Sequence, residues 1–184
     1  MRNRSQLGET RSGAGAEAGF SLIELLIVVA IILIIAAIAI PNFLRSKIAA
    51  NEASAAENVR TITTASVIYS TTWQNGYAPT MDSLGGTGTA ATCDLANLLD
   101  PVISSAPYTK SGYIYGYVGQ GGSIAGAPAG CGAPGFNGYL VTAVPQNSFT
   151  GVRSFCSSEP AVIHYDTSGA IAASETACEL LPTL

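Results

Sequence analysis

A long segment without charge limits what this chain can fold into. From Leu25 to Leu44 there are twenty residues with no Asp, Glu, Lys or Arg, and the first sixteen, ending at Ile40, are all apolar. A helix needs about 20 apolar residues to cross the hydrocarbon core of a bilayer, whereas strands in compact domains are much shorter. The segment therefore predicts a single membrane-spanning helix.

The scarcity of glycine and proline extends the predicted helix beyond this segment. None of the 20 glycines lies in residues 20–75, and Pro41 is the one proline there. Because Gly and Pro disfavour helix interiors by about 1 and about 3 kcal/mol, 20–75 is predicted to be helical, with a kink or local break at Pro41. The second half carries one apolar stripe opposite a polar side. The apolar positions are Ile48, Ala55, Val59, Ile62, Tyr69 and Trp73, and the polar ones are Lys47, Asn51, Ser54, Asn58 and Thr61.

Residues 77–184 hold most of the glycines and prolines and have strand-like patterns. The predicted strands are 113–118, 139–144, 152–156 and 161–166, with short helical turns at 81–84 and 95–102 and a flexible glycine-rich loop at 119–138. No helix here is long enough for parallel crossovers, so the sheet should be antiparallel. The fold class is α+β, with the stripe of 48–73 covering one sheet face.

Composition narrows the function. Only 11% of residues are charged and the net charge is −4, so the chain is unsuited to nucleic-acid binding. Residues 1–19 are polar and lack apolar periodicity, which is typical of a processing or targeting segment. We therefore expect four parts: a leader (1–19), a membrane half of the helix (20–44), an amphipathic half (45–76) and a globular head (77–184).

The junction between leader and helix reads Gly19-Phe20-Ser21-Leu22-Ile23-Glu24. Over residues 19–45 the chain resembles the type IV pilin and type II secretion pseudopilin family, and segments 110–113 and 152–155 add a weaker likeness. The family pattern is a hydrophilic leader ending in Gly, then Phe, a small polar residue, Leu-Ile-Glu and a long apolar helix. The resemblance implies a pilin-like fold, cleavage between Gly19 and Phe20 by a prepilin peptidase, and N-methylation of Phe20.

The resemblance also implies a structural role. The precursor would be held by lipid in the bacterial inner membrane with its leader in the cytoplasm, then extracted by an assembly platform and polymerised with copies of itself at the cell surface or in the periplasm. A type IV pilus subunit, serving motility or adhesion, is the first hypothesis. A pseudopilin of a type II secretion or DNA-uptake system is the alternative. No cofactor and no enzymatic activity are expected.

Two hypotheses lie outside that family. A secreted protein could be cut by signal peptidase after Ala37-Ile38-Ala39, which has small residues at the required spacing. However, the apolar run is longer than the usual 7–15-residue signal core. A membrane-anchored enzyme is the other hypothesis, for which no catalytic constellation is found.

Glu24 is the exception within the apolar helix. A carboxylate there costs about 2.5–3.5 kcal/mol on insertion scales and calls for a partner, yet the nearest basic residue along the helix is Arg45. The new α-amino group of Phe20, or that of another subunit, is the expected cation, and the resemblance implies that this pairing sets subunit register. The alternative is that Glu24 lies at headgroup depth and is solvated. Many family members have Gly where this chain has Leu33, so any melted segment in a filament should be shorter or confined to the approach to Pro41.

The four cysteines lie beyond the apolar segment, which fits an oxidising compartment. Of three connectivities we favour Cys93–Cys131 with Cys156–Cys178, because both close local loops; the family resemblance also implies a bridge near the C-terminus. No CxxC spacing supports a metal site. The remaining candidate residues are predicted to be structural or solvated. His164 should be a solvent-facing strand residue. Tyr113, Tyr115 and Tyr117 should form a ladder on the sheet surface, with Ile114 and Val118 facing the helix. The scattered carboxylates do not follow the spacing of a calcium-binding loop; they are Asp82, Asp94, Asp100 and Asp166. The alternative for that strand is an exposed tyrosine patch used for adhesion or for contact between subunits.

Overall fold

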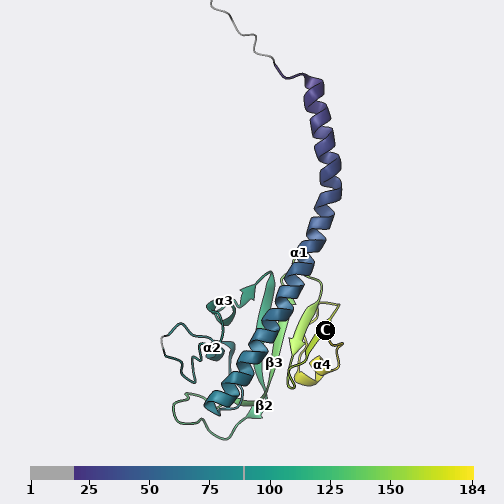
Figure 1. Cartoon of the computed structure of the whole chain (residues 1–184). Helices are drawn as coiled ribbons and strands as arrows, with labels where there is room; N and C mark the ends of the chain where they lie inside the picture. The colour runs from purple at the N-terminus through teal and green to yellow at the C-terminus, as the bar shows by residue number, and fades with distance from the viewer. Residues whose placement is uncertain (1–18, 89) are drawn as a thin grey trace, which may run out of the picture. The chain divides into compact units, whose positions relative to one another are not determined.

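The computed structural model describes residues 19–88 and 90–184 (Figure 1). These residues belong to two compact units divided between Pro41 and Asn42. One helix, α1, contributes residues to both units, and all other elements lie in the second. The elements in chain order are α1 (Leu22–Trp73), α2 (Met81–Leu84), α3 (Pro101–Ser104), β1 (Thr109–Lys110), β2 (Tyr113–Ser123), β3 (Phe136–Pro145), β4 (Ser154–Ser157), β5 (Ile163–Asp166) and α4 (Glu175–Glu179).

α1 matches the predicted helix within two residues at each end, but the break expected at Pro41 is absent. The backbone is helical on both sides of Pro41 and through it. Proline removes one N–H and thus one bond to the carbonyl four residues earlier, while the neighbouring residues keep theirs. A single missing bond is insufficient to end a helix of 52 residues.

The sheet is an antiparallel meander, as predicted, but it has five strands in the order β1-β2-β3-β4-β5 instead of the four expected. The additional strand, β1, has two residues and pairs with the start of β2. β2 and β3 are longer than expected because their pairing continues to Ser123 and Phe136, so the loop between them is 124–135 rather than 119–138. Gly119 lies within β2, and the ring of Phe136 occupies the space that a Cβ at this position would need. Glycine here permits close packing between the strands instead of marking a loop.

The core of the second unit lies between the C-terminal half of α1 and one face of the sheet. Ala55, Val59, Ile62 and Tyr69 of the predicted stripe are buried, so the sheet is covered by this helix as expected. Asn58, predicted to lie on the polar side, is also buried.

The orientation predicted for β2 was wrong. Tyr113, Tyr115 and Tyr117 are buried against α1, whereas Ile114 and Val118 are 46% and 56% exposed. Ala55, Ala56 and Ala65 of α1 belong to the same buried cluster as these rings, and small side chains on the helix leave room for large ones on the strand. Two of the three hydroxyls have partners: Asn58 Nδ2 donates to Tyr115 Oη at 2.8 Å, and Tyr113 Oη donates to the Arg153 carbonyl at 2.8 Å. The Tyr117 hydroxyl is buried without a hydrogen-bond partner among the described residues.

The structure forms both of the favoured disulfides, Cys93–Cys131 and Cys156–Cys178. The second bridge joins β4 to α4, and with Leu140 it forms a small core on the other face of the sheet.

His164 was expected to face solvent and does not. The residue is 8% exposed, and its Nδ1 lies 2.7 Å from the Leu181 carbonyl oxygen. The segment that follows α4 runs beside β5, where the Tyr165 N–H donates to the Pro182 carbonyl and His164 pairs with Thr183. This segment covers the side of β5 that the strand pattern predicted to be exposed to solvent.

Candidate functional site

The predicted assembly motif lies at the start of α1. Helical hydrogen bonding begins where the Leu25 N–H donates to the Ser21 carbonyl at 3.2 Å. Beside it, the Ser21 N–H donates to Glu24 Oε2 at 3.0 Å. This is one half of a capping box, in which an acid three residues into the helix binds the N–H at the cap. The positive end of the helix dipole also favours a negative charge here.

The capping bond changes which hydrogen-bond partner Glu24 has in the isolated chain. A cation was expected beside this carboxylate, because no basic side chain lies within helical reach of it. The structure shows that a backbone N–H of the same chain already accommodates one carboxylate oxygen. Glu24 therefore has a hydrogen-bond partner before any other subunit is present.

The predicted cleavage residues lie just before the helix. Gly19 and Phe20 are outside α1, and Phe20 is 85% exposed. Apart from Gly19 and its chain neighbours, no heavy atom of the described residues lies within 4 Å of the position of a Cβ at Gly19. A protease needs an accessible, extendable backbone, which glycine provides most readily. The junction is accessible on both sides of the predicted cut.

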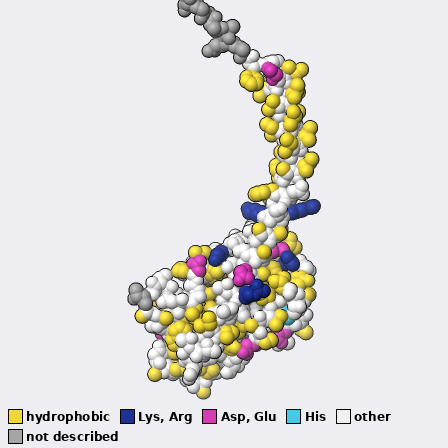
Figure 2. Space-filling view, viewed as in Figure 1, with side chains coloured by type: hydrophobic (Ala, Val, Ile, Leu, Met, Phe, Trp, Pro, Cys, Tyr) yellow, Lys and Arg dark blue, Asp and Glu magenta, His cyan; other side chains and the backbone are white. Residues whose placement is uncertain are grey.

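The apolar part of α1 is exposed on all sides in the isolated chain (Figure 2). The most apolar window of α1 has a mean hydropathy of 3.3 with none of its residues buried. Among the described residues this is the one helix long and apolar enough to cross a membrane. So large an apolar surface requires burial in lipid or against other chains.

Comparison with known families finds a match at the same end of the chain. A family profile described as the prokaryotic N-terminal methylation motif matches residues 15–40. The chain carries the leader motif of type IV pilins and pseudopilins. With the apolar helix, this motif fits a membrane-anchored precursor. No curated protein and no solved structure matches the chain significantly.

The other predicted candidates do not converge on one site. The cysteines form two separate bridges. Within residues 19–88 and 90–184, no group of three or more His, Cys, Asp or Glu side chains is arranged to hold a metal ion. Asp82 accepts a hydrogen bond from Tyr108 Oη, and Asp166 accepts one from the Ser168 N–H.

An ion pair between buried Glu52 and half-exposed Arg153, not predicted from the sequence, joins α1 to the turn before β4. Glu52 Oε1 accepts from the N–H groups of Val152 and Arg153 at 3.0 and 3.1 Å, and Oε2 accepts from Arg153 Nε at 2.8 Å. Burial by itself raises the pKa of Glu52, but the two backbone donors and the guanidinium outweigh it, so the pKa lies below the ordinary value of 4.5. The Arg153 guanidinium also lies over the rings of Phe155 and Tyr165.

A second missed residue, Asn75, joins the end of α1 to the first disulfide. Its side chain is fully buried. Asn75 Nδ2 has two hydrogens and lies 3.2, 3.3 and 3.1 Å from three acceptors, Tyr69 Oη, Cys93 Sγ and the Ala133 carbonyl oxygen, so one hydrogen is shared between two of them. Oδ1 accepts from the Gly135 N–H at 3.1 Å. One amide thus connects α1, the Cys93–Cys131 bridge and the loop 124–135.

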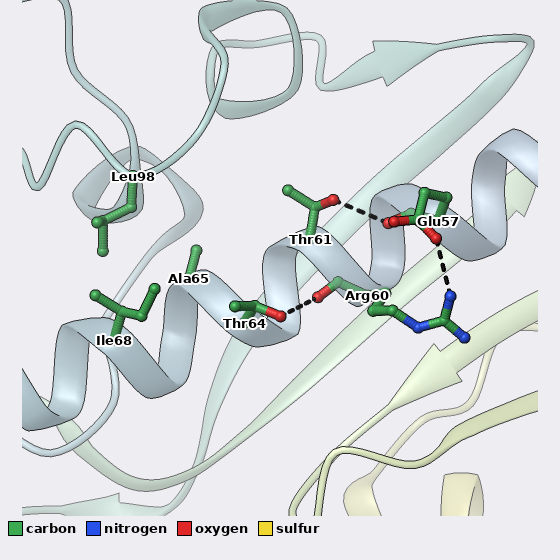
Figure 3. A pocket seen from close by; sticks show the side chains of 7 residues that line it. All are labelled: Glu57, Arg60, Thr61, Thr64, Ala65, Ile68 and Leu98. Atoms are coloured by element: carbon green, nitrogen blue, oxygen red, sulfur yellow. Dashed lines mark hydrogen bonds and ion pairs between the residues drawn. The ribbon is translucent and has the colours of Figure 1, made fainter.

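A groove of about 260 Å³ lies on the outer side of α1 (Figure 3). Its lining consists of Glu57, Arg60, Thr61, Thr64, Ala65, Ile68 and Leu98. Glu57 and Arg60 pair with each other at 2.9 Å, and the two threonine hydroxyls donate to carbonyls of their own helix. The two threonine hydroxyls and the Glu57–Arg60 pair therefore bond within α1.

Proposed function

We propose that this chain is a type IV pilin, cut between Gly19 and Phe20, methylated on Phe20, and polymerised into a pilus. The observation that carries the proposal is the leader motif placed directly before a helix with apolar side chains on every side. A bilayer can bury that surface before assembly, and the same helices from neighbouring copies can bury it afterwards. The sheet unit would then form the part of the subunit outside the membrane.

Each part of the chain has a role in this function. Residues 1–19 are the leader removed by a prepilin peptidase, 20–44 span the inner membrane and later contact other subunits, 45–76 support the sheet, and 77–184 complete the head. An inner-membrane assembly platform would extract the mature subunit. The leader motif supports processing and assembly of this kind.

Glu24 is proposed to set subunit register. Its carboxylate has one oxygen in the capping bond with Ser21, and the second oxygen remains for a cation. Cleavage creates an α-amino group on Phe20, and a charge-assisted bond to such a group from a neighbouring subunit is stronger than a neutral one. A subunit that brings an amine to Glu24 is thereby favoured over one in another register.

A pseudopilin is the second candidate, because the leader motif is common to both kinds of subunit. Shearing cells and identifying the main component of the released filaments separates the two. We expect this chain to be that component. Its absence from filaments, together with loss of protein secretion on deletion, would favour the pseudopilin.

The mass of the mature chain tests the processing step. We expect a start at Phe20 with one added methyl group, and full-length precursor in the membrane when Gly19 is replaced by a bulky residue. A mature start at Ile40 would instead indicate a conventional signal peptide. For assembly, Glu24→Ala should insert into the membrane but give few filaments, while Glu57→Ala, which removes an exposed acid from the same helix, should assemble normally.

A further inference from the structure

One end of the unit Asn42–Leu184 is formed by turns gathered around the start of its helix. Asn51 Nδ2 donates to the Thr150 carbonyl at 2.8 Å, and Ser54 Oγ donates to Ser111 Oγ at 3.0 Å. Glu52 holds the backbone of Val152 and Arg153. The turns 111–112 and 147–152 therefore lie beside α1 at residues 51–54, and we call this surface the helix-entry face.

Apolar side chains project from the helix-entry face. Phe149, at the tip of the turn between β3 and β4, is 71% exposed, and Val152 is 52% exposed. The Phe149 backbone is fixed by a hydrogen bond from its N–H to Asn147 Oδ1 at 3.0 Å. A large apolar side chain held outward on an ordered turn is available to contact an apolar partner.

Positive charge gathers at the same end. Four of the five Lys and Arg in residues 42–184 lie on or beside the helix-entry face: Arg45, Lys47, Lys110 and Arg153. Arg153 pairs with Glu52, and Lys110 lies 3.7 Å from Asp100. Arg45 and Lys47 are exposed and form no ion pair with the part of the chain that the structure describes.

The covalent chain keeps this face close to the end of the apolar segment. Seven residues separate Leu44 from Asn51 within α1, which at 1.5 Å per residue is about 10 Å. The polar headgroup layer on each side of a bilayer is roughly 5–8 Å thick. Whatever the tilt of the spanning helix, the helix-entry face cannot lie far from the headgroups.

We propose that the helix-entry face binds the surface of an anionic membrane while the subunit is stored in the bilayer. Phe149 and Val152 enter the interfacial layer, and Arg45 and Lys47 contact lipid phosphates. Aromatic side chains and Lys or Arg are the groups that favour this layer. The inference rests on the proposed membrane-stored precursor, and it adds that the head is held against the membrane instead of moving freely above it.

Fluorescence quenching by lipid tests the contact. The mature chain with Trp73→Phe carries a single probe, Phe149→Trp, and is reconstituted into vesicles of equal parts phosphatidylcholine and phosphatidylglycerol that contain a nitroxide-headgroup lipid. The matched control is Ser123→Trp, ten positions along β2 from Tyr113 and so about 33 Å further from this end. Val152→Trp is a second probe in case the first variant folds poorly.

We expect the nitroxide to quench Trp at position 149 and to leave Trp at position 123 unaffected. Arg45→Gln with Lys47→Gln, or removal of phosphatidylglycerol, should reduce the quenching about twofold. Equal quenching at positions 149 and 123 overturns the proposal, as does quenching at 149 that neither change alters. Vesicle flotation is scored first: a chain that fails to float contradicts the membrane-stored precursor as well, whereas a floating chain without preferential quenching contradicts this inference alone.

Discussion

Replacing Glu52 by alanine should destabilise the head more than any other single loss of charge. The carboxylate accepts three hydrogen bonds, its side chain is 8% exposed, and its partners lie 100 and 101 residues away in the sequence. Removing one member of a buried pair costs 3–5 kcal/mol. Arg153 is 39% exposed and can regain water, so we expect the low end, about 3 kcal/mol.

Glu52→Gln separates the charge from the shape. Its amide oxygen can still accept from the N–H groups of Val152 and Arg153, but its NH₂ group cannot accept from Arg153 Nε. One charge-assisted bond is lost, so the expected cost is about 1.5–3 kcal/mol. The matched control is Glu57→Ala, which removes an ion pair whose side chains are both more than half exposed and should cost under about 1 kcal/mol.

Thermal unfolding of the mature chain in non-ionic detergent, followed by near-ultraviolet circular dichroism, measures these differences. For a domain of this size about 3 kcal/mol corresponds to a fall in Tm of roughly 6–12 °C. Equal losses of Tm in Glu52→Ala and Glu57→Ala would contradict a stabilising role specific to Glu52. A Glu52→Gln variant with the wild-type Tm at neutral pH would contradict the role of its charge.

The same pair predicts a pH dependence. Because the pKa of Glu52 is lower in the folded chain than its ordinary 4.5, the unfolded state binds the proton more tightly, and the stabilisation is fully present above the unfolded pKa. It declines as the pH falls below about 4.5 toward the folded pKa. The Tm difference between wild type and Glu52→Gln should therefore be constant near neutral pH and narrow in acid; a difference that widens in acid would contradict the sign.

Further substitutions probe the core. Tyr115→Phe leaves the Asn58 amide without its partner and should cost about 1–2 kcal/mol, with a smaller combined cost for Tyr115→Phe plus Asn58→Leu than the sum of the single costs, measured by a double-mutant cycle. Asn75→Ala removes the buried amide that bonds the Ala133 carbonyl and the Gly135 N–H and should speed amide exchange in the loop 124–135 at least tenfold; unchanged exchange there would contradict its linking role. Cys93→Ser with Cys131→Ser opens a bridge of sequence separation 38 and should cost about 4 kcal/mol in urea unfolding.

The long helix, the meander and the bridges could be predicted because local composition determines them. Glycine and proline are nearly absent from 20–75, and the distances between cysteines favour local loops. The leader motif is likewise a contiguous pattern, recognised without any tertiary contact. These features depend on residues close together in the chain.

The face of β2 could not be predicted in the same way. Strand alternation separates Tyr113, Tyr115 and Tyr117 from Ile114 and Val118, but both sets are suited to burial. The choice depends on the space left by alanines on α1 and on a partner for the Tyr115 hydroxyl at Asn58. The face of β2 that is buried depends on side-chain volume and hydrogen bonding between β2 and α1. The alternation of residues along the strand carries no information about either of these.

The burial of Glu52 could have been predicted from its position in the sequence. It lies three and seven residues before Ala55 and Val59, so it shares the apolar stripe of α1 and is bound to be buried with it. A carboxylate on such a stripe predicts a buried partner. The identity of that partner, Arg153, is beyond sequence reasoning because 101 residues separate the two.

The way α1 lies on the sheet has a mechanical consequence. Buried residues run from Glu52 to Tyr69, roughly 26 Å of helix at 1.5 Å per residue. A force drawn along α1 would load the contacts over this whole length together, as shear, instead of opening them one after another. Forced unfolding is governed by the height of the unfolding barrier, and shear geometry places many contacts in one barrier. A subunit of this design should extend its helix only after the helix–sheet contact fails as a unit, which a single-molecule pulling trace would record as one large step.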